Sequence, residues 1–165
     1  MNFLPTSRLT FLALALASAF MMLTALIYFQ TALKLNPCPL CITQRVFVIA
    51  IGIIGLIGFI HNPQKVGRRI YAGLALIMAL VGGGVSARHM WLQSLPADQV
   101  PACGPGISYL FETFPVIDAL KLLFQGDGNC ADIQWSLLGL SIPGWTLVGF
   151  VGLAVVALIQ TLRRE

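Results

Sequence analysis

The sequence predicts an all-α membrane protein, a bundle of four transmembrane helices, and composition and charge spacing both support this class. Of the 165 residues, 58% are hydrophobic and only 10% are charged. A water-facing exterior needs about 25 to 35% charged residues. The mean hydropathy is +0.87, and the few charges separate four apolar stretches long enough to cross a bilayer. We therefore expect a single integral membrane domain over residues 1–165 that is surrounded by lipid.

Charged residues bound the four spans, because a charge at the centre of a spanning helix costs about 2.5 to 3.5 kcal/mol. The first span lies between Arg8 and Lys34, and the second is short unless its helix begins near Cys41. The third lies between Arg69 and Arg88. The predicted spans are residues 9–29, 42–60, 70–87 and 145–162, and the predicted outer loops are residues 30–41 and 88–144.

The first span has an alternative interpretation as a cleavable signal peptide. Arg8, the apolar core and the sequence Ala17-Ser18-Ala19 resemble the three regions of such a peptide. The apolar run continues past Ala19 to Phe29, which is long for a secretory core. This length favours an uncleaved span.

The basic residues predict the orientation of the bundle. Six of the ten lie before the first span, between the second and third, or after the fourth, namely Arg8, Lys65, Arg68, Arg69, Arg163 and Arg164. The positive-inside rule makes this side cytoplasmic and puts both termini there. All four cysteines then lie on the outer, periplasmic face. The net charge of +4 is not arranged as a basic stripe with interleaved aromatic residues, so we expect no nucleic-acid partner.

The long outer loop is predicted to carry a short amphipathic helix. Its apolar residues recur at helical spacing, at Val116, Ile117, Leu120, Leu123 and Phe124. Such a helix would lie on the bilayer surface or pack as a lid, and the sequence leaves both open. Gly126 and Gly128 are expected to give the following segment conformational freedom.

The four cysteines predict redox chemistry. Cys38-Pro39-Leu40-Cys41 has the spacing of a reversible disulfide, and a helix start favours the thiolate. Cys103 and Cys130 form a second pair. Two alternatives are structural disulfides and a zinc site using all four thiolates. A static C-x-x-C disulfide closes almost no loop, so it would stabilise little, and we predict a redox role and no metal.

Two further polar residues are candidates for binding an electron acceptor. Arg45 follows Cys41 by four positions, so on a helix the two share a face. Arg45 is expected to stabilise the Cys41 thiolate or to hold a carbonyl oxygen of a bilayer-dissolved acceptor, unless its side chain snorkels to the interface. His89, at the outer end of the third span, would donate to the acceptor or bond at the interface.

Together these motifs resemble the bacterial disulfide bond formation protein B (DsbB) family over nearly the whole chain. The matching segments are NPCPLC at 36–41, QR at 44–45, HMWLQ at 89–93, GNCADIQW at 128–135, LGL at 138–140 and PGW at 143–145. One departure is Gln44, where the best-known member carries a glutamate, so the charge near the acceptor differs.

The resemblance implies a four-helix bundle in the bacterial inner membrane that acts as a protein-dithiol:quinone oxidoreductase. Its partner would be a DsbA-like periplasmic thiol oxidase of the thioredoxin fold, and its cofactor ubiquinone or menaquinone from the membrane pool. Cys103 would form the mixed disulfide with the partner, and Cys130 would exchange with Cys38. Cys41 would then meet the quinone beside Arg45, with His89 as a further quinone contact.

Two rival functions remain open from the sequence. A vitamin K epoxide reductase-like enzyme also combines a four-helix bundle, a C-x-x-C motif and a quinone. That family carries its motif near the last spans, whereas here it precedes the second span. A non-enzymatic membrane scaffold with two structural disulfides is the other rival.

Overall fold

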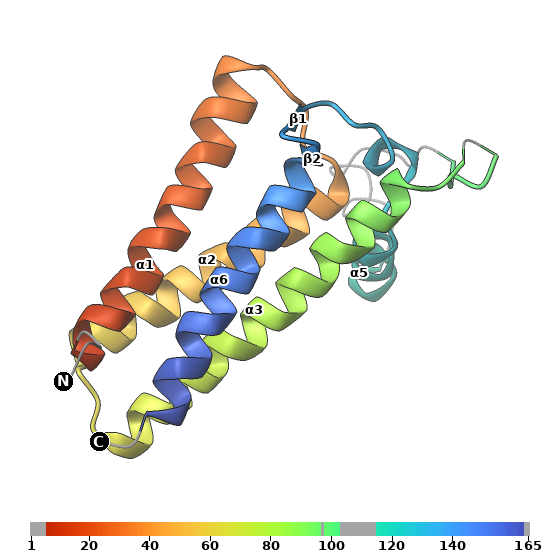
Figure 1. Ribbon diagram of the computed structural model, residues 1–165. Helices are drawn as coiled ribbons and strands as arrows, with labels where there is room; N and C mark the ends of the chain where they lie inside the picture. The colour runs from red at the N-terminus through yellow and green to blue at the C-terminus, as the bar shows by residue number, and fades with distance from the viewer. Residues whose placement is uncertain (1–5, 97, 103–114, 164–165) are drawn as a thin grey trace.

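The computed structural model describes residues 6–96, 98–102 and 115–163 and consists mainly of four long helices (Figure 1). Each of the four is long and apolar enough to cross a membrane. The predicted all-α, four-span membrane class is therefore confirmed. The helices are α1 (Ser7–Leu23) with its π-helical continuation η1 (Thr24–Ala32), α2 (Pro39–His61), α3 (Lys65–Gln93) and α6 (Ile142–Leu162).

All four helices extend beyond the apolar runs from which they were predicted. The third span was expected over residues 70–87, whereas α3 includes Arg68 and Arg69 in its first turns and Arg88 and His89 near its end. A helix keeps its backbone hydrogen bonds beyond the hydrocarbon region, and long basic side chains reach the interface from there. Charges thus mark the edge of the apolar core rather than the end of the helix.

Small residues on α3 allow the central helices to pack closely. Ala72, Ala75 and Ala79 recur along one face of α3 and are fully or almost fully buried. Phe150 and Leu153 of α6 belong to the same buried cluster, and α3 packs along α6 while α2 packs against both α1 and α3. Because lipid offers no hydrophobic drive between helices, such close packing is a main source of association.

Polar contacts join three helices at one end of the bundle. The buried Arg68 guanidinium at the start of α3 donates to the Arg163 carbonyl oxygen at 3.0 Å. The Gln160 side chain near the end of α6 donates to Ser7 Oγ at 2.7 Å. The start of α1 and the end of α6 therefore lie at the same end, as Figure 1 also shows.

The described segments between α3 and α6 lie toward the opposite end of the bundle (Figure 1). They include α5 (Val116–Gln125), the 3₁₀ turn η2 (Gly128–Cys130), β1 (Ser136–Leu137) and β2 (Leu140–Ser141). The two strands pair antiparallel, with Ser136 opposite Ser141. Leu138 and Gly139 both have positive φ, 54° and 80°, as a two-residue type I′ hairpin turn requires.

Helix α5 covers the residues whose spacing predicts an amphipathic helix, and its C-terminal part packs on the bundle. Leu123 is buried, and the Phe124 ring lies 6.4 Å from the ring of Phe47 on α2, measured between centroids. Ile117, nearer the start of α5, is 70% exposed. Among the described side chains of α5, those of the last turn therefore contact the bundle.

Candidate functional site

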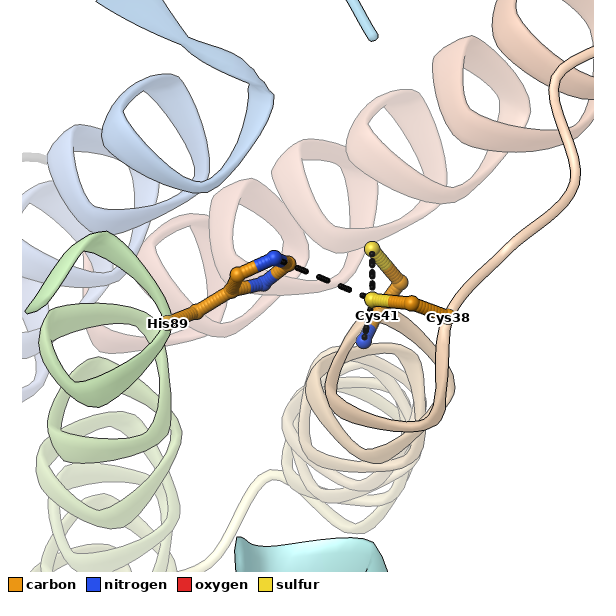
Figure 2. A group of neighbouring side chains, drawn as sticks. All are labelled: Cys38, Cys41 and His89. Carbon is orange, nitrogen blue, oxygen red and sulfur yellow. Dashed lines mark hydrogen bonds between the residues drawn. The ribbon is translucent and has the colours of Figure 1, made fainter. Parts of the chain in front are cut away.

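The C-x-x-C motif forms the first turn of α2. Cys38 is the N-cap residue and Pro39 follows at the first helical position, where its missing N–H and fixed φ suit a helix start. Cys38 Sγ accepts a hydrogen bond from the Cys41 N–H at 3.4 Å, and its thiol lies 3.1 Å from Cys41 Sγ as donor. Both sulfur atoms thus lie at a helix N-terminus, side by side (Figure 2).

Cys130 lies against this pair although it is far away in the sequence. It ends η2, is fully buried, and belongs to the same cluster as Cys38, Leu40 and Leu92. Asp127 caps η2 by accepting a hydrogen bond from the Asn129 N–H at 3.1 Å. The structure therefore brings together three of the four predicted cysteines, all as free thiols.

Cys103, the fourth predicted cysteine, lies outside the described residues. Its neighbour Ala102 is described, and the Ala102 carbonyl oxygen accepts a hydrogen bond from the Gly128 N–H at 3.3 Å. The chain leading to Cys103 is thus tied to the turn that carries Cys130.

The neighbouring sulfur atoms shift the pKa values of Cys38 and Cys130 in opposite directions. The interactions of Cys38 with Cys130 and with Cys41, together with burial, raise the pKa of the Cys38 thiol far above its ordinary value. The interaction with Cys38 lowers the pKa of Cys130 to about 7, against the opposing effect of burial. Cys38 therefore keeps its proton, whereas the Cys130 thiol ionises near neutral pH.

His89 projects from α3 toward Cys38 rather than standing apart from the sulfur atoms (Figure 2). Its Nε2 lies 3.7 Å from Cys38 Sγ, and the side chain is 2% exposed. On the other side of the ring, Nδ1 lies 3.2 Å from the amide Nε2 of Gln44, which is itself buried. The imidazole is thus held between an amide and a thiol.

Arg45 lies on the other side of the motif and reaches across to the first transmembrane helix. Its guanidinium donates to Gln30 Oε1 at 2.8 Å and to the Ala25 carbonyl oxygen at 3.3 Å. Both partners belong to η1, and π-helical segments are often found at functional sites. Arg45 is thereby held one turn below Cys41, the arrangement that their spacing predicts.

A pocket between α1, α2 and α6 opens beside Cys41 and Arg45. Its wall is mostly apolar, with a few polar groups near the sulfur. The lining residues are Met21, Met22, Ala25, Phe29, Leu35, Asn36, Pro37, Cys41, Gln44, Arg45, Val48, Gln134, Ile142 and Thr146. A second apolar pocket between α1 and α6 shares Met21, Ala25, Phe29, Ile142 and Thr146 with it, so the two form one groove along these helices.

His89 does not line this apolar pocket. It lines a smaller and more polar one, together with Cys38, Cys41, Gln93, Asn129 and Asp132. The two pockets adjoin, because Asn36, Cys41, Gln134 and Ile142 line both of them. Arg45 lies on the apolar side of the motif and His89 on its polar side.

Hydrogen bonds from Arg88 hold the Cys130 segment against the bundle. Arg88 Nε donates to the Phe124 carbonyl oxygen at 3.0 Å, and Arg88 Nη2 donates to the Gln125 carbonyl oxygen at 3.0 Å. These are the last carbonyl groups of α5, where a cation is favoured by the helix dipole. Arg88 therefore fixes the point at which the chain leaves α5 for Cys130.

Gly126 follows directly and packs closely against the bundle, whereas the conformational freedom expected of it from the sequence stays a prediction. It has φ +74°, and a Cβ at this position would lie 2.7 Å from Leu40 Cδ1 and 2.8 Å from Leu92 Cδ1. Gly128 is buried within η2. Gly126 thus serves close packing in a left-handed conformation, and this packing places Cys130 beside Cys38.

The sulfur and nitrogen atoms of Cys38, Cys41 and His89 also satisfy the spacing of a metal site. Their ligand atoms all lie within 4.8 Å of one another. Two thiolates and an imidazole are ligands that zinc accepts. The prediction of no metal therefore needs its own test, because this geometry serves either chemistry.

Gln44 and Gln30 orient the two candidate polar residues, His89 and Arg45, a role that the sequence patterns did not predict. Gln44 follows Cys41 by three positions, so helical spacing alone would have placed it on the cysteine face. The Gln30 contact with Arg45 joins two different helices. Neither spacing nor composition signals such a pairing.

Comparison with known proteins gives one consistent match. The family described as disulfide bond formation protein DsbB matches residues 7–160. A protein of Saccharophagus degradans named Disulfide bond formation protein B is 57% identical over 161 residues, which cover 98% of this chain and 96% of the relative. A protein of the same name from Stutzerimonas stutzeri is 44% identical over 162 residues, covering 98% of this chain and 99% of the relative.

Proposed function

Because the chain belongs to the family of disulfide bond formation protein DsbB, a family of disulfide-forming oxidoreductases with transmembrane helices, we propose that it is a dithiol:quinone oxidoreductase. In this proposal it reoxidises a DsbA-like thiol oxidase of the thioredoxin fold. The electrons pass to ubiquinone or menaquinone in the bacterial inner membrane.

The observation that carries this proposal is the order of the sulfur atoms. Cys130 lies against Cys38, Cys38 lies 3.1 Å from Cys41, and Cys41 lines the apolar pocket that also contains Arg45. Thiol–disulfide exchange needs an attacking sulfur beside a sulfur of the disulfide. This order of sulfur atoms therefore supports transfer of electrons from Cys130 to Cys38 and then to Cys41.

In the reduced chain the Cys38 thiol lowers the pKa of Cys130 to about 7, and this effect is lost once Cys38 is part of a disulfide. In the exchange step itself the Cys130 thiolate would be the nucleophile. Cys103 would exchange disulfides with the soluble partner before Cys130 does. The carbonyl oxygen of Ala102, the residue before Cys103, accepts a hydrogen bond from the Gly128 N–H in η2. This contact supports disulfide exchange between Cys103 and Cys130.

The residues around the apolar pocket fit a quinone. Its mostly apolar wall suits a hydrophobic ring, and the shared groove between α1 and α6 would suit a polyprenyl tail. Arg45 would hold a carbonyl oxygen of the ring, next to the Cys41 sulfur. A bound quinone supplies a two-electron acceptor, and the protein supplies the dithiol, the cation and a water-poor site.

The energetics require a strong acceptor. The couple of DsbA lies at about −120 mV, which is unusually oxidising for a protein disulfide. An ordinary structural disulfide, below about −300 mV, is too stable to oxidise it. A membrane quinone provides the missing drive, and it would meet the thiols at the outer ends of the spans.

The orientation proposed here rests on the basic residues. Arg68 and Arg163 lie at the bundle end opposite the cysteine cluster. The positive-inside rule makes their end cytoplasmic and the cysteine end periplasmic. A soluble periplasmic partner would then approach the end of the bundle that carries the cysteine cluster.

Reconstitution of the purified chain in lipid vesicles tests this function. We expect a reduced thioredoxin-fold dithiol to be reoxidised only when quinone is present, and we expect Cys41→Ser to abolish turnover. Arg45→Gln should lower kcat/KM for quinone about a hundredfold, the usual cost of removing one donor from an anion-stabilising site. Arg69→Gln is the matched control. It removes the same charge, and Arg69 is exposed near the start of α3, away from the cysteine cluster. Absence of turnover in the parent chain would favour the scaffold alternative, and normal turnover of Cys41→Ser would contradict the role proposed for Cys41.

A further inference from the structure

One buried titratable residue has no role in the function proposed above. His89 is 2% exposed, lies within the α2–α3 packing, and is not part of the wall of the apolar pocket. Its Nε2 instead lies 3.7 Å from Cys38 Sγ. A buried imidazole beside a reacting sulfur has the position of an acid–base group.

We propose that His89 is the acid–base partner of Cys38 and that Gln44 positions its ring for this task. The inference rests on the proposed function in one respect, that Cys38 and Cys41 alternate between dithiol and disulfide. It concerns only the proton on Cys38. It assigns His89 to the sulfur rather than to the electron acceptor.

The need for such a partner follows from the surroundings of Cys38. Its thiol is buried and donates to Cys41 Sγ at 3.1 Å. A thiol must lose its proton before its sulfur can attack. Water reaches this 7% exposed group poorly, so a base within the protein has to accept the proton.

The proposed step balances as follows. Cys38 Sγ gives its proton to His89 Nε2 and forms the S–S bond with Cys41. The bond between Cys41 Sγ and its leaving group, thiopyridone in the assay below, breaks, and the leaving group keeps the electron pair. When Cys38 later becomes the leaving group of a Cys38–Cys130 disulfide, Cys130 bonds to the incoming sulfur, and His89 Nε2 returns a proton to Cys38. In turnover, two electrons and two protons pass to the quinone named above.

Gln44 suits the positioning role because its amide carries both a donor and an acceptor. In the structure its Nε2 lies 3.2 Å from His89 Nδ1, so the amide donates and Nε2 of the ring carries the proton. Rotation of the amide would present Oε1 and stabilise the other tautomer, with Nε2 as the base. Gln44 can therefore accompany the ring through both halves of the cycle.

Few other charged groups face His89. Cys38 and Cys41 approach from the start of α2, Cys130 from η2 and Asp132 from the segment after it. Arg88, its neighbour in the sequence, turns its guanidinium to the end of α5. The polar pocket that His89 shares with Asp132, Asn129 and Gln93 is bordered by exposed residues and offers the proton a route to water.

The test uses closure of the Cys38–Cys41 disulfide without quinone. In a Cys103→Ser, Cys130→Ser chain, a dipyridyl disulfide first reacts with Cys41, and attack by Cys38 then releases a second thiopyridone. We expect His89→Asn to slow this second release about a hundredfold near neutral pH, the usual contribution of general base catalysis. The ratio of the parent rate to the His89→Asn rate should fall about tenfold for each pH unit above neutral, because hydroxide then replaces His89 as the base.

Gln44 provides a second variant pair with the same readout. Gln44→Leu should slow closure, and Gln44→Glu should restore it because a carboxylate also binds the ring nitrogen. Ser86→Ala is the control, since Ser86 is a fully buried polar residue on α3 one turn before His89, and it should close at the normal rate. Closure of His89→Asn at the normal rate, or slowed equally at every pH, would overturn the inference.

The same experiment separates this inference from the proposed function. Failure of the parent chain to form any Cys38–Cys41 disulfide would sink the proposed function itself, because the pair would not be redox-active, and the His89 role with it. Normal closure that does not depend on His89 or Gln44 would sink only the inference. Quinone turnover, measured separately, reports on the acceptor.

Discussion

Replacing Gly126 with alanine should release the Cys130 segment from the bundle. A non-glycine residue at φ +74° costs about 1 to 2 kcal/mol. The added methyl group would also lie 2.7 Å from Leu40 Cδ1 and 2.8 Å from Leu92 Cδ1. Both leucines are almost fully buried, so moving them adds about 1 to 3 kcal/mol. The docked state should therefore lose about 2 to 5 kcal/mol.

Alkylation of Cys130 in the reduced chain measures this change. Because Cys130 is fully buried, it reacts through transient opening of its segment, at a rate proportional to the open population. A loss of 2 kcal/mol or more should raise that rate at least about thirtyfold, up to the rate of an exposed thiol. Peptide mapping by mass spectrometry assigns the label to Cys130.

Gly139→Ala is the matched control for Gly126→Ala. Gly139 also has a positive φ, +80°, but a Cβ there would meet nothing within 4 Å. It lies in the hairpin rather than beside Cys130, so its variant should alkylate within about threefold of the parent rate. If Gly126→Ala reacted no faster than the parent, or if both variants rose equally, the packing account of this segment would be refuted.

Three further predictions concern the thiols and the bundle. The difference in ultraviolet thiolate absorbance between the parent and Cys130→Ser reports on Cys130, and it should titrate with a midpoint of about 7. In Cys38→Ala this midpoint should move up toward 9.0, because the thiol that lowers the pKa of Cys130 is removed. An unchanged midpoint would exclude Cys38 as the cause. Gly82→Ala should destabilise the chain by about 1 to 3 kcal/mol in detergent unfolding, because the new methyl group would overlap the Phe150 ring. Gly84→Ala is the control: its methyl group would meet nothing within 4 Å and should change stability by less than about 0.5 kcal/mol. Chelator treatment should leave quinone turnover unchanged, and loss of activity that zinc restores would support the metal alternative.

The sequence was sufficient to predict the four spans, because membrane helices are selected by length and polarity, and both are local properties. It also predicted that Arg45 lies one turn from Cys41, since helical spacing fixes that relation. Helix ends were less predictable. α3 continues through Arg88 and His89, because its backbone hydrogen bonds do not depend on the surrounding lipid.

The contacts between segments could not be predicted from spacing. Placement of Cys130 against Cys38 depends on Gly126 meeting two leucines from different helices. The direction of His89 depends on an amide from α2. Both depend on packing between distant segments, and the patterns in a single sequence do not reveal which distant side chains meet. His89 accordingly lines a different pocket from Arg45, and the acceptor contact expected of it stays a prediction.

The most direct test of the central claim is an anaerobic titration of the reconstituted chain with limiting quinone and an excess of reduced thioredoxin-fold dithiol. The account predicts one partner disulfide formed for each quinone reduced, with no product in Cys41→Ser. Disulfide formation that continues after the quinone is exhausted, or quinone reduction without disulfide formation, would contradict it.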